Sequence, residues 1–180
     1  MAMSIKEISD VFTEIGWKHR FSENEEVIIS GGGDEDNNLM FITNSDDDGE
    51  LFNMVGRIMD DDNNQINAKD HKHVNALMAY LLLRNYETKF GTWEFDIENG
   101  VISFAVEIPL EDNKLTAKQL ERITRVMNSS GEEASNIKHI LETGKVKEEM
   151  SDAEMIAKLE SLIAMMKDNS SSDSSDSDGI

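Results

Sequence analysis

The sequence contains no cysteine, so disulfide bonds and thiolate chemistry are excluded. No apolar run approaches the roughly 20 residues that a helix needs to cross a bilayer. The N-terminus also lacks the basic segment followed by an apolar segment that is typical of an export signal. We therefore expect a cytoplasmic protein that does not enter a membrane.

Basic residues are scarce in this chain. It has 17 Lys and Arg against 37 Asp and Glu among 180 residues, which gives a formal net charge of −20. Because this charge repels nucleic-acid phosphates and anionic membranes, neither is an expected partner. The simplest role of the acidity is solubility. The alternative is an acidic decoy that occupies a basic nucleic-acid-binding protein through residues 34–62 and the C-terminal tail.

Complete metal sites are also missing. Residues 44–49 match the start of a calcium loop, but Val55 stands where the loop needs a bidentate glutamate. The pattern favours an ordinary Asp-Gly hairpin turn instead. His71 and His73 are two residues apart and would point in different directions on a helix. The sequence therefore predicts no metal-binding residues.

Catalytic groupings are missing as well. The run 31–33 is all glycine, but acidic residues follow it where a phosphate loop needs Lys-Ser or Lys-Thr, so we interpret it as a flexible turn. No serine lies in a Gly-x-Ser-x-Gly elbow. We expect no catalytic residues and no cofactor, and hence a non-enzymatic protein.

The first half of the chain has a helical pattern followed by strand patterns. Ser4 and Glu7 fit a capping box at the start of a helix over residues 4–16. Short apolar segments separated by polar turns then predict strands over residues 27–29, 39–42 and 51–58. These strands would form an antiparallel meander.

A central helix is predicted over residues 70–84. Its buried stripe is expected to contain Val74, Leu77, Met78, Leu81 and Leu82. Alternating apolar residues then predict two strands, over residues 93–97 and 102–108. Asn99 and Gly100 between them suit a type I′ hairpin turn.

The second half ends in helical patterns. Thr116 and Gln119 form a capping box for a helix that runs to Met127, and the small residues 129–131 interrupt it before the pattern resumes and stops at Gly144. The expected fold class is α+β, an antiparallel sheet with helices packed on one face. We assign residues 1–150 to this domain.

An amphipathic helix is predicted as an addition over residues 151–167, and its apolar face needs a cover. Packing against its own domain or a second copy is one use of that face, and partner binding is the other. The residues expected to bind a partner are Met155, Leu159, Leu162, Ile163 and Met166. Residues 168–180, rich in Ser and Asp, are predicted to be a disordered acidic tail.

A family resemblance accompanies these patterns. It rests on Asn85 ahead of Phe90-Gly91, on Trp93-Glu94-Phe95-Asp96, on Gly100 with Ile102-Ser103-Phe104, and on the join over residues 110–120. With the element order, these positions resemble the YbjN family, whose α+β fold is similar to the small chaperones of type III secretion. The likeness covers residues 4–144 in element order and is motif-like over residues 77–123.

The resemblance implies a regulator that binds protein and dimerises, and it supplies no catalytic residues. We therefore expect a non-enzymatic protein-binding or regulatory protein with a chaperone-like fold, a homodimer whose protein partner the sequence does not identify. The Asp- and Gly-rich first half and the segment after Ser151 depart from the family pattern. These departures affect the choice of partner more than the fold.

Overall fold

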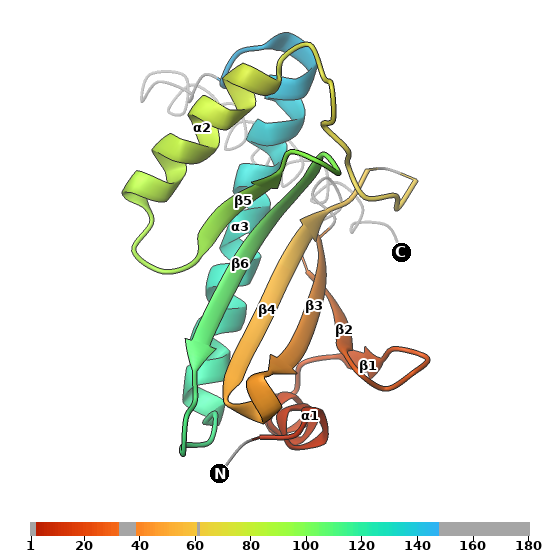
Figure 1. Ribbon diagram of the computed structural model, residues 1–180, viewed down its shortest axis with the longest axis vertical. Coiled ribbons are helices and arrows are strands. Elements are labelled where there is room, and N and C mark those ends of the chain that lie inside the picture. Colours follow the sequence, from red (N-terminus) through yellow and green to blue (C-terminus); the bar gives the residue numbers. More distant parts are fainter. Residues whose placement is uncertain (1–2, 33–38, 61, 148–180) are drawn as a thin grey trace, which may run out of the picture. The chain divides into compact units, whose positions relative to one another are not determined.

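One antiparallel sheet organises the computed structural model, which describes residues 3–32, 39–60 and 62–147 (Figure 1). In the described part the strand order is β1-β2-β3-β4-β6-β5. The strands are β1 (His19–Phe21), β2 (Ile28–Gly32), β3 (Leu39–Asp46), β4 (Leu51–Ile58), β5 (Thr92–Asp96) and β6 (Val101–Pro109). The meander is confirmed, but β1 was missed because its three residues are too few to show an alternating pattern.

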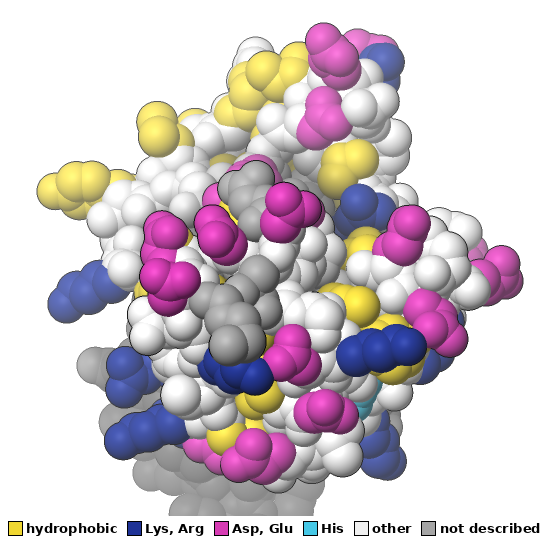
Figure 2. Space-filling model, turned by 60° about the horizontal axis from the view of Figure 1, so that its bottom comes forward, with side chains coloured by type: hydrophobic (Ala, Val, Ile, Leu, Met, Phe, Trp, Pro, Cys, Tyr) yellow, Lys and Arg dark blue, Asp and Glu magenta, His cyan; other side chains and the backbone are white. Residues whose placement is uncertain are grey.

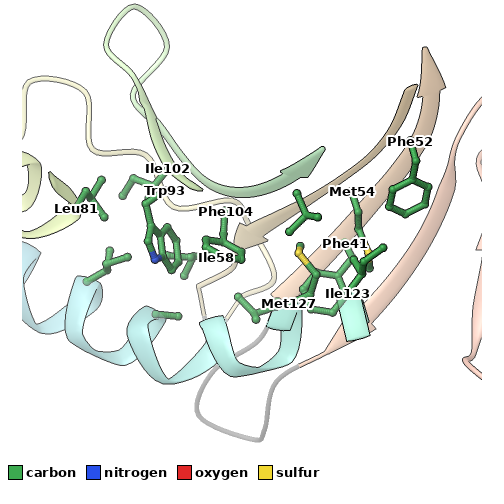
Figure 3. Packing of buried hydrophobic residues seen from close by; sticks show 14 of the residues in the cluster. Phe41, Phe52, Met54, Ile58, Leu81, Trp93, Ile102, Phe104, Ile123 and Met127 are labelled. Carbon is green, nitrogen blue, oxygen red and sulfur yellow. The ribbon is translucent and has the colours of Figure 1, made fainter. Parts of the chain in front are cut away.

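Helix α3 (Ala117–Thr143) lies along one face of the sheet (Figures 1 and 3). Helices α1 (Ile5–Glu14) and α2 (Val74–Glu87) each contact α3. This arrangement confirms the α+β fold class with helices on one face. The added helix predicted over residues 151–167 and the tail over residues 168–180 lie outside the described residues, and both stay predictions.

The core lies between α3 and the strands. Figure 3 shows Phe41, Met54 and Phe104 pointing from the sheet toward Ile123 and Met127 of α3. All five side chains are buried, because alternate residues of each strand face the helix. This packing fixes α3 against β2, β4 and β6.

The glycines of β2 correct one sequence interpretation. Gly31 and Gly32 belong to the strand rather than to a flexible turn. A β-carbon on Gly32 would collide with the Phe41 ring and with the side-chain oxygen of Asn128 on α3. Glycine is therefore needed here because the helix and an aromatic side chain approach the backbone closely.

The expected break in the last described helix is also wrong, since α3 continues through residues 129–131. Ser129 and Ser130 donate their hydroxyl protons to the carbonyl oxygens of Val126 and Met127, at 2.8 and 2.6 Å, so their polar atoms are satisfied within the helix. Ser130 and Gly131 are buried. Small residues here allow close packing instead of ending the helix.

The hairpin of β5 and β6 is confirmed, although its turn is not type I′. Asp96 pairs with Val101, so four residues connect the strands, and Gly100 has a φ of 73° while Asn99 does not have a positive φ. The Asp96 carboxylate accepts hydrogen bonds from the backbone N–H groups of Glu98 and Asn99. The side-chain hydrogen bond from Asn99 is the main cause of the lowered pKa of Asp96. The Asp96 side chain therefore organises the turn.

Both capping boxes that fall on described residues are confirmed, and the first carries an ion pair. Glu7 accepts a hydrogen bond from Lys114 at 2.7 Å and one from the backbone N–H of Ser4 at 2.9 Å. These bonds, with Lys114 first, lower the pKa of Glu7 from 4.5 to about 2. The pair joins the first turn of α1 to the loop that precedes α3.

A pH dependence follows from this pair. A lowered folded pKa means that ionised Glu7 stabilises the fold fully above pH 4.5 and loses this contribution as the pH falls toward 2. Glu7→Gln should therefore reduce the urea midpoint at pH 7, and the gap to the wild type should close by about pH 2.5. Glu14→Gln is the control, because Glu14 forms no ion pair in the described part. A gap that does not change with pH would contradict the assignment.

Candidate protein-interaction surface

Helix α2 packs by one side against β5 and α3. Leu77, Tyr80 and Leu81 form this buried side. Arg84 extends the contact, because its guanidinium forms an ion pair with Glu133 of α3 at 3.0 Å. The hydroxyl of Tyr80 donates a hydrogen bond to the same carboxylate, and burial together with that carboxylate raises the pKa of Tyr80. Glu133 therefore holds two successive turns of α2 against α3.

The opposite side of α2 is exposed and apolar. Met78, Leu82, Leu83 and Tyr86 are exposed by 37%, 73%, 50% and 90% respectively, and we call these four residues the outer α2 face. Met78, Leu82 and Tyr86 are four residues apart and so follow one side of the helix. The predicted inward set was therefore partly wrong: Leu77 and Leu81 point inward, whereas Met78 and Leu82 point outward.

Charged residues approach the outer α2 face within the helix only at its C-terminal end, where Arg84 and Glu87 flank Tyr86. No Asp, Glu, Lys or Arg occurs over residues 73–83, although 30% of the whole chain is charged. The neighbouring Arg84 is ion-paired with Glu87 and Glu133, so it is directed along the α3 side of the helix. An exposed apolar surface of this kind is a candidate interaction site.

Hydrophobic side chains project at the left edge of the space-filling view (Figure 2). The C-terminal end of α2 lies on this side in Figure 1. Acidic and basic side chains are interspersed over much of the remaining face. Other hydrophobic side chains are visible elsewhere on this face, but four of the large exposed ones in the described structure, Met78, Leu82, Leu83 and Tyr86, belong to α2.

Asn85 fixes the position of α2 on the sheet. Its side-chain amide accepts a hydrogen bond from the backbone N–H of Trp93 at 2.7 Å and donates one to the carbonyl oxygen of the same residue at 2.8 Å. Trp93 belongs to β5, the edge strand, whose outer backbone groups have no strand partner in the described sheet. Asn85 therefore protects this edge against pairing with another chain.

The residues predicted to bind a partner, Met155, Leu159, Leu162, Ile163 and Met166, lie outside the described residues. Sequence reasoning missed the outer α2 face because it assigned Met78 and Leu82 to the core. The available signal was the apolar run 76–83, whose side chains lie all round the helix. A helix that is apolar on every side is normally buried on every side, so a side that its own domain leaves exposed is a candidate contact surface.

The motifs considered for metal binding occupy structural positions. Asp47–Gly49 form the turn between β3 and β4, which confirms the hairpin interpretation. His73 is the N-cap of α2, and its pKa is lowered by burial and by the nearby charges of Lys72 and His71. Among the described residues, no group of three or more His, Asp or Glu side chains is placed to hold a metal ion. None of the helices in this part is long and apolar enough to span a membrane.

The structure is that of a small α+β protein with an antiparallel sheet covered by helices on one face. A comparison of the sequence with known families identifies the family. The model of the YbjN family, described as "Putative bacterial sensory transduction regulator", matches residues 4–136. The chain belongs to this family. No curated protein matches its sequence.

Two solved structures resemble the chain. One is YbjN from E. coli, described as a putative transcription regulator, with 12% identity, a TM-score of 0.50, and coverage of 80% of this chain and 93% of that one. It is similar in fold. The other is the HopA1-SchA chaperone-effector complex, with 16% identity, a TM-score of 0.45, and coverage of 69% of this chain and 86% of the matched chain.

Proposed function

We propose that this chain is a non-enzymatic, cytoplasmic protein-binding regulator that forms a homodimer through the outer α2 face. The observation that carries the proposal is the exposure of Leu82, Leu83 and Tyr86 on the side of α2 that does not pack against β5 and α3. Membership of the YbjN family supports a regulatory role. A protein of this kind acts by contact with other proteins.

A second copy of the chain is the occupant that best fits the outer α2 face. Two chains that each carry a net charge of −20 repel one another over most of their surfaces. Association is therefore favoured where charge is sparse, and the outer α2 face is such a place. A two-fold axis would lay Leu82 and Tyr86 of one copy against the same helix of the other.

The dimer would bind a separate protein partner, with neither nucleic acid nor a membrane as a ligand. The proposed partner-binding residues remain Met155, Leu159, Leu162, Ile163 and Met166. The support for them comes from the sequence alone, in which they form the apolar side of a helical pattern that begins with a capping box. The acidic decoy is the second candidate, supported by the net charge of −20. It differs in one measurable respect: binding to a basic protein would weaken steeply with salt, whereas apolar self-association would not.

Sedimentation equilibrium of the full chain tests the homodimer. The chain has a mass of 20.3 kDa, so a dimer has about 41 kDa. We expect the dimer mass at micromolar concentrations, and we expect it to persist when the salt concentration is raised. A monomer mass at every concentration would contradict self-association. A dimer that dissociates in high salt would contradict the apolar nature of the contact.

A further inference from the structure

A groove lies where α3 begins, beside the loop that follows α2. It has a volume of about 390 Å³. Phe90 of that loop, Ile108 of β6 and Ile123 of α3 form its apolar part. Ile123 is buried, while Phe90 is exposed by 36%, so the apolar floor opens to solvent. This volume lies at the lower end of the range for ligand sites and accommodates an apolar amino-acid side chain.

The rim of the groove is basic. Lys118 and Arg122 line it, four residues apart on one side of α3. Neither Lys118 nor Arg122 forms an ion pair within the described residues. Figure 2 shows Lys and Arg side chains at the lower left of that view, on the side where α3 begins in Figure 1. This rim is a positively charged patch on a protein with a net charge of −20.

The end of α3 adds to the positive potential. A helix N-terminus carries a partial positive charge, which acidic residues in the first turn commonly offset. The first turn of α3, within the described structure, contains no acidic residue, whereas that of α1 contains Glu7. Lys114 just before α3 is neutralised by Glu7 at 2.7 Å, in contrast to Lys118 and Arg122. The charge at the groove therefore remains available to a ligand.

We propose that this groove binds an acidic peptide segment of a partner protein, with one apolar side chain against Phe90, Ile108 and Ile123 and flanking carboxylates on Lys118 and Arg122. The proposal rests on the protein-binding function above and supplies its partner chemistry. Charge complementarity selects this occupant, because the floor accepts an apolar group and the rim accepts anions. A nucleic acid carries a charge on every nucleotide and extends well beyond the groove, so the negative charge of the whole chain repels it more strongly than a short peptide segment with a few carboxylates.

Fluorescence anisotropy with a synthetic peptide tests the proposal on the full chain. The probe has twelve residues, one central Leu and flanking Asp and Glu, and two control peptides replace either the Leu by Ser or the acids by their amides. We expect the probe to bind in the micromolar range and each control peptide to bind at least about tenfold more weakly. No binding of the probe below about 1 mM would overturn the proposal.

Charge reversal then locates the site. The double variant Lys118→Glu with Arg122→Glu should weaken probe binding by at least about tenfold, since two attractive pairs become repulsive. Arg125→Glu is the matched control outside the groove lining and should change binding by less than about threefold. Equal effects of both variants would overturn the assignment to the groove. Thermal unfolding of each variant verifies that the fold is retained.

Two further outcomes are decisive. If charge reversal at Lys118 and Arg122 shifts the NMR signals of Ser170 and Ser177 in the full chain, the groove binds the chain's own acidic tail. That result would overturn the proposal that a separate partner protein occupies the groove. If single-stranded DNA competes with the probe, the peptide specificity is overturned. The groove proposal and the homodimer proposal can fail independently. The proposed dimer face is on α2, so the double variant at Lys118 and Arg122 should keep the sedimentation mass of the wild type even if it no longer binds the probe.

Discussion

The double variant Leu82→Glu with Tyr86→Glu is expected to sediment as a monomer of 20.3 kDa under conditions in which we expect the dimer mass for the wild type. Both side chains are among the most exposed apolar groups of the described structure, at 73% and 90%. In the dimer the new carboxylates would be buried against the same helix of the second copy. An unpaired charge buried at an interface costs about 3 kcal/mol or more, which corresponds to at least about 100-fold weaker association.

The variant should keep its fold, because Leu82 and Tyr86 make few contacts within their own chain. Ile97→Glu is the matched control: Ile97 is exposed by 71% but lies in the turn after β5, outside α2. The control should retain the dimer mass. Because dimerisation stabilises the folded state by mass action, the melting temperature of the wild type should rise with concentration, while that of the double variant should not. A double variant with the dimer mass would contradict the role of the outer α2 face.

The fold was largely predictable because its strongest signals are local. Ser4 with Glu7 and Thr116 with Gln119 satisfy helix N-termini within four residues, so both starts could be located from the sequence. The alternation of Phe52, Met54 and Ile58 likewise depends on strand geometry alone. Such signals need no knowledge of what packs against them.

The candidate surface was less predictable because it depends on tertiary contacts. Leu81 and Leu82 are chemically identical, and only the placement of α2 beside β5 and α3 decides that one is buried and the other is exposed by 73%. The same holds for the groove, where Phe90, Ile108 and Ile123 come from three separate segments. The spacing of residues along the sequence cannot predict that such residues lie close together in the fold. A chain-wide charge of −20 also conceals a local basic rim.

Asn85→Ala is expected to lower the free energy of unfolding by about 2 kcal/mol, because the backbone N–H and carbonyl of Trp93 lose their partners together. Trp93 itself is buried against Phe104, with ring centroids 5.1 Å apart, so this stretch of β5 is part of the core. Urea denaturation measures the change in stability. Hydrogen exchange at the Trp93 amide should accelerate more than exchange in β4, since the loss is confined to the sheet edge.

Asn75→Ala is the control for this prediction. Asn75 lies on the same helix, so both substitutions make the same chemical change and the same gain in helix propensity, but Asn75 is exposed. We expect its effect on stability to stay within about 0.5 kcal/mol. Equal urea midpoints for the two variants would show that the Asn85 amide does not hold β5. A further consequence distinguishes edge protection from simple stabilisation: Asn85→Ala should aggregate on prolonged incubation, because the exposed N–H and carbonyl groups of β5 can pair with the same strand of another molecule.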